Sequence, residues 1–457
     1  MRTLDIVKIK NNRLKYYYLI IILTFIFISY YFESRTLIAI SIFLSLFFSF
    51  LNPITIGIPL LVMSTFDARI IFLVTERITF SRLIIICLII SILLKHIIVK
   101  QKFHIKPNKG VIIFIFFLFF INIFSVFNSL SQNDSIITFF SISLNIIFFL
   151  EFISLYNIED EVLYNQIILS IAYTIFFFFI WIFSKDITNF ELKTFIYGRK
   201  RLNLVLSAES SEFARSLALG VSFLFYHIIN KKTQNFIEMI VSYLALILGC
   251  FMLIGSGTRT AFYGAIFGML FISIIFLKKN KRNKLNNYLN YFIPLSIILG
   301  ISILYFQYSP LFSRYFIASI IQSGGTGRFT LWGVFIKKIA TKYYLYGTGL
   351  GGATEGIALM KEGSIASIHA AHNMLLQILI ELGIFGLMIY GMFFFITFKK
   401  GFYSIKKNIP FIIPYYTLFL ICIFMGIGEG MFVNRVFWIS IAFVWRYSPK
   451  YILREKI

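Results

Sequence analysis

One histidine stands where a proton acceptor for a group-transfer reaction could act. His372 is followed by Asn373 and then by Gly383 and Gly386, in the segment HAAHNMLLQILIELGIFGLMIYG. On an ideal helix of about 100° per residue, both glycines fall within roughly 40° of His372 and share its face. Glycines on such a stripe let a neighbouring helix approach closely, which would fix the position of the histidine. The alternative is a helix-packing glycine pair below an incidental histidine.

Two arginines could bind an anion at the same site. Arg259 lies in GSGTRTAF and Arg328 in GGTGRFTLW. A guanidinium stays charged and binds phosphate through two parallel hydrogen bonds. We predict that Arg259 and Arg328 share one site with His372. The alternative for each arginine is snorkelling or pairing with a glutamate, and Arg215, three residues after Glu212, is the clearest such case.

Other polar features carry weaker signals. Glu381 lies about 180° from His372 on an ideal helix, so we expect no direct pairing between them. His369 is interpreted as a loop histidine. A glycine-rich stretch contains Gly347, Gly349, Gly351 and Gly352. It resembles a phosphate-binding loop but lacks the Gly-Lys-Ser/Thr that follows in such loops, so it is interpreted as a turn. No metal-ligand spacing is evident, and we predict neither a metal nor a cofactor.

Composition identifies the elements that must hold these residues. Of the 457 residues, 59% are hydrophobic and 14% are charged, against roughly 25% charged in a soluble domain. The net charge of +24 would suggest nucleic acid if it formed one patch, but the basic residues lie between apolar runs. That pattern is typical of anchoring to membrane lipids. We predict an all-α polytopic membrane protein that binds no nucleic acid.

Apolar runs near the spanning length of roughly 20 residues predict about 12–14 transmembrane helices. The chain divides into helices with short loops (1–307), one long outer loop (308–371) and C-terminal helices (372–457). The two weakest runs are 36–51 and 53–66, because Asn52-Pro53 interrupts the apolar sequence between them. These two runs could form a re-entrant hairpin instead of two transmembrane helices. The fourteen runs lie near 16–32, 36–51, 53–66, 82–99, 111–130, 136–156, 164–184, 212–230, 236–255, 260–277, 288–307, 372–398, 410–428 and 431–446.

The distribution of Lys and Arg predicts the orientation. With the N-terminus inside, 24 basic residues in six short segments fall on the inner side. The outer side then receives 67–81, 185–211, 255–259 and 308–371. Within the last of these, apolar residues at helical spacing predict an amphipathic interfacial helix; they are Leu331, Trp332, Phe335, Ile336 and Ile339.

The histidine segment, the long outer loop before it and Gly257-Thr258-Arg259 together resemble the O-antigen ligase/polymerase superfamily. The resemblance covers roughly 197–398. It implies transfer of a glycan from undecaprenyl diphosphate to an acceptor hydroxyl, at the periplasmic face of the bacterial inner membrane, without metal. His372 would be the general base, Arg259 and Arg328 would bind the diphosphate, and Asn373, Gly383 and Gly386 would support the site. Family members carry Ser-Arg where this chain has Thr258-Arg259.

The resemblance leaves the acceptor open. A polymerase adds another lipid-linked repeat unit, with a chain-length regulator protein as an expected partner, and a ligase uses the lipid A core. The long outer stretch rich in aromatics and the Ile/Phe/Lys/Asn bias favour the polymerase. A lipid-linked oligosaccharide flippase is the alternative from another class. Its ionisable residues should line a midplane cavity, whereas here they crowd one boundary.

Overall fold

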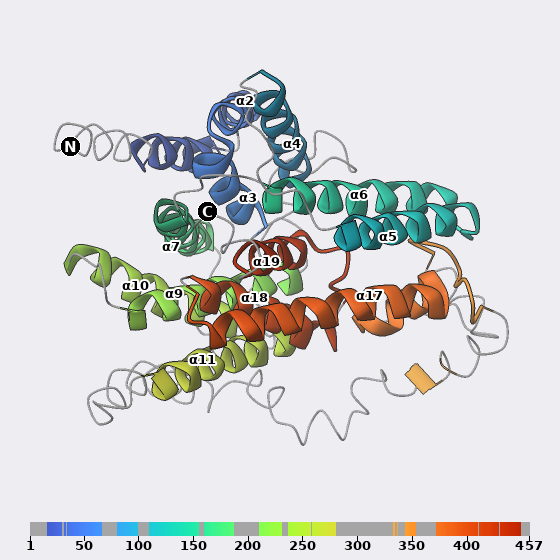
Figure 1. Cartoon of the computed structure of the whole chain (residues 1–457). Coiled ribbons are helices and arrows are strands. Elements are labelled where there is room, and N and C mark those ends of the chain that lie inside the picture. The colour runs from blue at the N-terminus through green and yellow to red at the C-terminus, as the bar shows by residue number, and fades with distance from the viewer. Residues whose placement is uncertain are drawn as a thin grey trace. The chain divides into compact units, whose positions relative to one another are not determined.

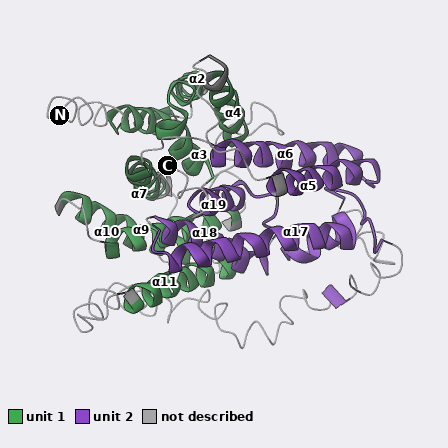
Figure 2. Cartoon of the chain, in the orientation of Figure 1, with its two compact units in different colours: residues 1–102, 156–312 green, residues 103–155, 313–457 purple. Residues whose placement is uncertain are grey.

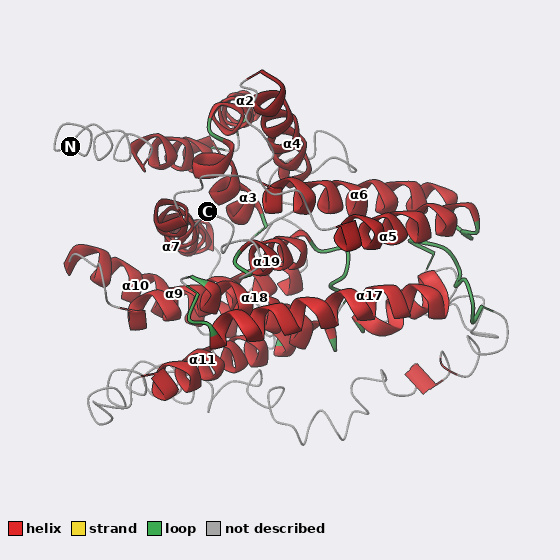
Figure 3. Ribbon diagram, in the orientation of Figure 1, coloured by secondary structure: helices red, strands yellow, loops and turns green. Residues whose placement is uncertain are grey.

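Figure 1 shows the computed structural model of the chain. The described residues are 16–29, 32, 34–65, 80–98, 109–154, 160–186, 210–230, 236–256, 258–279, 332–333, 336, 343–352, 372–409, 411–428 and 430–448. Within these ranges the regular structure is helical and no strand occurs (Figure 3). Among the described residues, six helices are long and apolar enough to cross a membrane, and six shorter apolar helices accompany them. The protein is therefore an all-α polytopic membrane protein, as its composition predicts.

The helices belong to two compact units, which are described separately (Figure 2). Unit 1 comprises 1–102 and 156–312, and unit 2 comprises 103–155 and 313–457. Unit 1 holds a helix at Tyr16–Ser29, α2 (Arg35–Leu51), the π-helical turn η1 (Pro53–Gly57), α3 (Ile58–Ser64), α4 (Phe80–Ile98), α7 (Asp160–Asp186), α9 (Ser210–Asn230), α10 (Phe236–Gly255) and α11 (Arg259–Lys279). Unit 2 holds α5 (Lys109–Phe127), α6 (Gln132–Ser154), α17 (Met374–Lys406), α18 (Ile412–Gly426) and α19 (Arg435–Arg446).

The break predicted at Asn52-Pro53 is present. α2 ends at Leu51, and Asn52 leaves the helical region with φ −131° and ψ 70°. Proline fixes its own φ and cannot donate a backbone hydrogen bond, so a regular helix does not continue through it. The apolar helical piece Pro53–Ser64 rises only about 18 Å, short of the roughly 30 Å of a bilayer core. This second piece is therefore too short to span alone.

The helix α9 is the centre of unit 1. It packs against α7, α10 and α11, and its side chains from Phe213 to Ile229 are buried throughout. Gly249 of α10 admits a close approach, because a Cβ there would lie 2.8 Å from Val221 of α9. A helix enclosed on all sides by protein presents no face to lipid, so α9 positions the helices around it.

Aromatic side chains and a few polar contacts form the core of unit 2. Tyr390 of α17 is fully buried, and its hydroxyl accepts a hydrogen bond from the Asn122 amide of α5 at 2.9 Å. The Trp445 indole of α19 donates to the Thr397 hydroxyl of α17 at 2.8 Å. Buried hydrogen bonds of this kind specify which helix faces meet, because an unpaired polar group in apolar surroundings is costly. They hold α17 between α5 and α19.

Several of the predicted spans correspond to helices whose ends agree within a few residues. Two other predicted helices fall wholly or largely outside the described residues. The span near 288–307 lies outside the described residues. Of the predicted amphipathic helix, only Trp332, Gly333 and Ile336 are described, and Ile336 is exposed. The span near 372–398 corresponds to α17, which runs on to Lys406 and contains a break described below.

Candidate functional site

Asn373 caps the start of α17. Its backbone is extended (φ −155°, ψ 122°), and its side-chain oxygen accepts a hydrogen bond from the Leu376 amide at 3.0 Å. The Asn373 side-chain amide donates to the Ile427 carbonyl, just after α18, at 3.2 Å. Asparagine is among the preferred N-cap residues because its oxygen satisfies an otherwise unpaired helical N–H. Asn373 thus fixes both the beginning of α17 and its attachment to the end of α18.

His372 lies immediately before this cap in a strained conformation. Its φ is +48°, a left-handed region that residues other than glycine rarely adopt. The side chain is half-buried. Such an outlier persists only where the surroundings fix it, and such outliers cluster at functional sites. His372 therefore lies outside the helix, immediately before the N-cap of α17.

The predicted placement of Gly383 and Gly386 beneath His372 is wrong. His372 is not part of the helix, and α17 breaks at Gly383, whose φ is +67° and ψ −166°. The helical angles from His372 to the glycines therefore do not apply. Gly383 admits a close approach, but of a loop: a Cβ there would lie 2.2 Å from the Leu345 carbonyl oxygen. Only glycine combines that backbone conformation with that contact.

The loop at the break is the segment 343–352, which carries the glycine-rich stretch. Its backbone bonds to α17 on both sides of Gly383. The Thr348 amide donates to the Ile380 carbonyl at 2.7 Å, and the Ile384 amide donates to the Tyr344 carbonyl at 2.8 Å. These contacts satisfy backbone groups that the broken helix leaves free. Non-helical backbone at membrane depth is tolerated where protein encloses it in this way.

The interpretation of the glycine stretch as a turn is confirmed. Gly347, Gly349 and Gly351 have φ of +72°, +96° and +71°. A Cβ on Gly349 would lie 2.1 Å from the Ser129 Cα, in the turn between α5 and α6. The same turn bonds to the segment through the Leu130 amide, which donates to the Thr348 carbonyl at 3.1 Å. Residues 347–350 of the segment are therefore buried between α17 and the α5–α6 turn, whereas Tyr344, Leu345 and Tyr346 stay exposed.

Glu381 is a polar residue of this junction that the sequence interpretation missed. Its side chain is 1% exposed. One carboxylate oxygen accepts a hydrogen bond from the Gly351 amide at 3.0 Å, and the other accepts one from the Gln377 side-chain amide at 2.9 Å. The Gln377–Glu381 spacing of four residues is the signal that could have shown a pair on one helix face.

Arg259 is the first residue of α11 in unit 1. Thr258 precedes it, and the Thr258 amide donates to the Ser256 hydroxyl at 3.2 Å. The Arg259 side chain is half-buried. The hydroxyl of the neighbouring Thr260 is buried and has no hydrogen-bond partner among the described residues. The N-terminus of a helix disfavours a cation and favours an anion, so an arginine there adds to the attraction for a negatively charged group.

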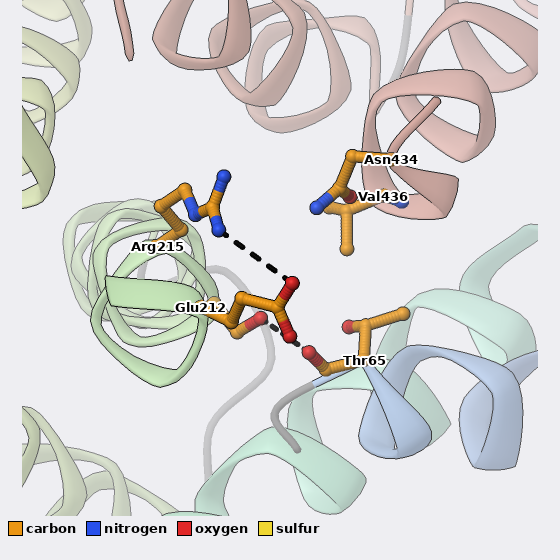
Figure 4. Close-up of polar contacts among 6 residues, drawn as sticks. Thr65, Glu212, Arg215, Asn434 and Val436 are labelled. Atoms are coloured by element: carbon orange, nitrogen blue, oxygen red, sulfur yellow. Dashed lines mark hydrogen bonds and ion pairs between the residues drawn. The ribbon is translucent and has the colours of Figure 1, made fainter. Parts of the chain in front are cut away.

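The prediction that Arg215 pairs with Glu212 is confirmed. Its guanidinium lies 3.8 Å from the Glu212 carboxylate on the first turns of α9 (Figure 4). The neighbouring Ser216 hydroxyl donates to the carbonyl of Thr65, just after α3. The ion pair therefore lies within the first turns of α9, and Ser216 attaches these turns to the end of α3.

The structure describes only some of the other predicted site residues. Arg328 and His369 lie outside the described residues. Arg259 belongs to unit 1 and His372 to unit 2. The expected sharing of one site by these residues therefore stays a prediction.

One comparison with known families gives a match. Residues 244–391 match the family model described as O-antigen ligase. The matched range begins within α10 and ends within α17, so it contains Arg259, Arg328, His372 and the junction at Gly383. No curated protein matches the chain. The matched range draws on both units, and neither unit holds it alone.

Proposed function

We propose that the chain is a glycosyltransferase acting on a glycan carried by undecaprenyl diphosphate, because residues 244–391 match the O-antigen ligase family model. The acceptor is a sugar hydroxyl, and the reaction takes place at the periplasmic face of the bacterial inner membrane. The observation that carries this proposal is the position of His372 inside the matched range, with a positive φ immediately before the N-cap of a candidate membrane helix. A residue at the end of a membrane helix can meet both a lipid-borne donor and the sugars that extend from the membrane into water.

The chemistry requires a proton acceptor and a stabiliser of negative charge. As the acceptor hydroxyl attacks the anomeric carbon, its proton passes to the His372 imidazole. The bond between that carbon and the phosphate oxygen breaks, and its electron pair leaves with undecaprenyl diphosphate. A guanidinium from Arg259, with a second from Arg328, meets the charge that develops on the leaving diphosphate. The step needs no nucleotide, and the donor itself supplies the leaving group.

The described contacts support these roles unequally. His372 has a fixed backbone, because Asn373 caps α17 behind it. Arg259 stands at a helix start beside the unpartnered Thr260 hydroxyl, a setting suited to an anion. Arg328 is carried over from the family resemblance alone. Gly383 and Gly386 support the site indirectly, and Gly383 does so by admitting the segment 343–352.

We favour the repeat-unit polymerase among the reactions of this family. Deleting the gene and separating the surface glycan by gel electrophoresis tests this assignment. Lipid A core capped with a single repeat unit indicates a polymerase, whereas bare core with polymer accumulated on undecaprenol indicates a ligase. Absence of repeat units from the periplasm would indicate a flippase and would contradict the proposed transfer reaction.

A further inference from the structure

Glu381 is a buried acid inside a candidate membrane span. It lies in α17, within the apolar helix Met374–Lys406, and is 1% exposed. An ionisable side chain at such a position is costly unless hydrogen bonds or charges compensate for its burial. Here the compensation comes from the Gly351 amide and the Gln377 side chain. The apolar requirements of a spanning helix do not explain why an acid stands at this position.

The Glu381 carboxylate joins two parts of the chain that are distant in sequence. Gln377 lies one turn earlier on the same helix, whereas Gly351 belongs to the segment 343–352. Other bonds between that segment and α17 include one from the Gly349 amide to the Glu381 carbonyl at 3.0 Å and one from the Thr348 hydroxyl to the Ile380 carbonyl at 3.1 Å. On the α17 side these bonds use backbone atoms, which many sequences supply. The carboxylate contact instead requires an acceptor side chain at position 381, so it makes the docking depend on the sequence of α17.

Docking at Glu381 bears on His372 through α17 itself. Glu381 and Gln377 lie in the part of α17 before the break at Gly383, and His372 lies immediately before that part begins. Glu381 stands seven residues beyond Met374, a rise of about 10 Å along α17. The segment 343–352 bonds to α17 on both sides of Gly383, so it helps to fix the orientation of this first part of the helix. Release of the segment would let the first part of α17 move, and His372 would move with it.

We propose that Glu381 is a positioning residue. Its carboxylate, with Gln377 and Gly351, forms a latch that holds the segment 343–352 in the break of α17 and so keeps the first part of α17, which His372 precedes, in its orientation. This role rests on the proposed glycan transfer, whereas the latch itself does not. Precise placement of groups around a reacting centre is worth large factors in rate, so a small displacement of His372 lowers turnover.

Two variants test the latch with nearly unchanged side-chain shape. In Glu381→Gln the amide has one acceptor oxygen, for which the Gly351 and Gln377 donors compete. In the double variant Glu381→Gln with Gln377→Glu, the amide at 381 donates to the carboxylate at 377 and its oxygen accepts from Gly351. The double variant restores both contacts and the charge. Glu161→Gln is the matched control, because Glu161 is an exposed acid in the first turn of α7 and belongs to unit 1.

The experiment uses the full chain in lipid nanodiscs and has two readouts. The first is hydrogen exchange of peptides covering 343–352, and the second is steady-state transfer from a synthetic undecaprenyl-diphosphate oligosaccharide. We expect Glu381→Gln to speed exchange at least about tenfold and to lower kcat at least about tenfold, a loss of the size that one buried contact to a charged group gives. We expect the double variant to recover both quantities and Glu161→Gln to leave both unchanged.

The outcomes separate the latch from the proposed reaction. Unchanged exchange in Glu381→Gln would overturn the latch. Faster exchange with kcat within twofold of the wild-type value would overturn the positioning role, as would failure of the double variant to recover kcat. If the wild-type protein transfers no glycan, the proposed function fails, and the exchange measurement alone decides whether the latch exists.

Discussion

Replacing Gly383 by alanine should undock the segment 343–352 from α17. The Cβ would lie 2.2 Å from the Leu345 carbonyl oxygen, 2.4 Å from the Leu345 carbonyl carbon and 2.6 Å from the Tyr346 nitrogen. These are backbone atoms, which cannot swing aside as a flexible side chain could. The φ of +67° adds a second penalty, because alanine adopts the left-handed region at a cost of about 1–2 kcal/mol.

The size of the effect follows from the contacts that the segment must give up. To clear the new methyl group, the loop has to move by about an ångström, which breaks the Ile384–Tyr344 and Gly349–Glu381 backbone bonds. Each contributes about 0.5–1.5 kcal/mol. With the conformational penalty, docking is weakened by about 2–5 kcal/mol, roughly a 30-fold to several-thousand-fold change.

Gly391→Ala provides the matched control on the same helix. A Cβ at Gly391 meets nothing within 4 Å, and alanine in a helix interior is favoured over glycine by about 0.5–1 kcal/mol. Hydrogen exchange across 343–352 and thermal unfolding of the purified protein measure the two variants. We expect fast exchange and a lower Tm for Gly383→Ala and neither for Gly391→Ala. Equal behaviour of the two variants would refute the account of the break.

Two further predictions concern the arginine and the orientation. Arg259→Lys keeps the charge but loses the two parallel hydrogen bonds, so we expect glycan transfer to fall well below half of the wild-type rate; activity within about twofold would assign Arg259 to anchoring. Cysteines placed one at a time in 278–287 and in 308–371, in a Cys-free background, should react with an impermeant thiol reagent in intact spheroplasts only within 308–371, because the basic residues around Lys278 resist translocation. Labelling of 278–287 would contradict the predicted membrane orientation.

Hydropathy and local sequence signals predicted much of the fold. Apolar runs alone identify membrane helices, since their length is set by the bilayer. The break after Leu51 follows from Pro53, whose ring geometry acts locally. The same holds for the ion pair between Glu212 and Arg215, where residues three apart on a helix are neighbours. Each of these features depends on residues close together in the chain.

The break at Gly383 depends on distant residues and could not be predicted in that way. A glycine in an apolar run has the same local signal whether a helix or a loop packs against it. Its φ of +67° is set by the segment 343–352, whose contacting residues Leu345 and Tyr346 come nearly forty positions earlier and meet it only in the folded protein. The significance of Glu381 has the same origin, because its partner Gly351 comes from that segment. Asn373, by contrast, could have been identified as an N-cap from its residue type.

The most direct test of the central claim compares two replacements of His372 in glycan transfer by purified protein from a synthetic undecaprenyl-diphosphate donor. His372→Gly removes the imidazole and suits the φ of +48°, so it should stabilise the backbone; His372→Asn keeps a polar side chain that tolerates the same region. If the imidazole is the general base, both variants lose roughly 10²–10⁴-fold in kcat at normal membrane abundance. If His372 serves only the turn before α17, both keep wild-type turnover, and that result would contradict the account.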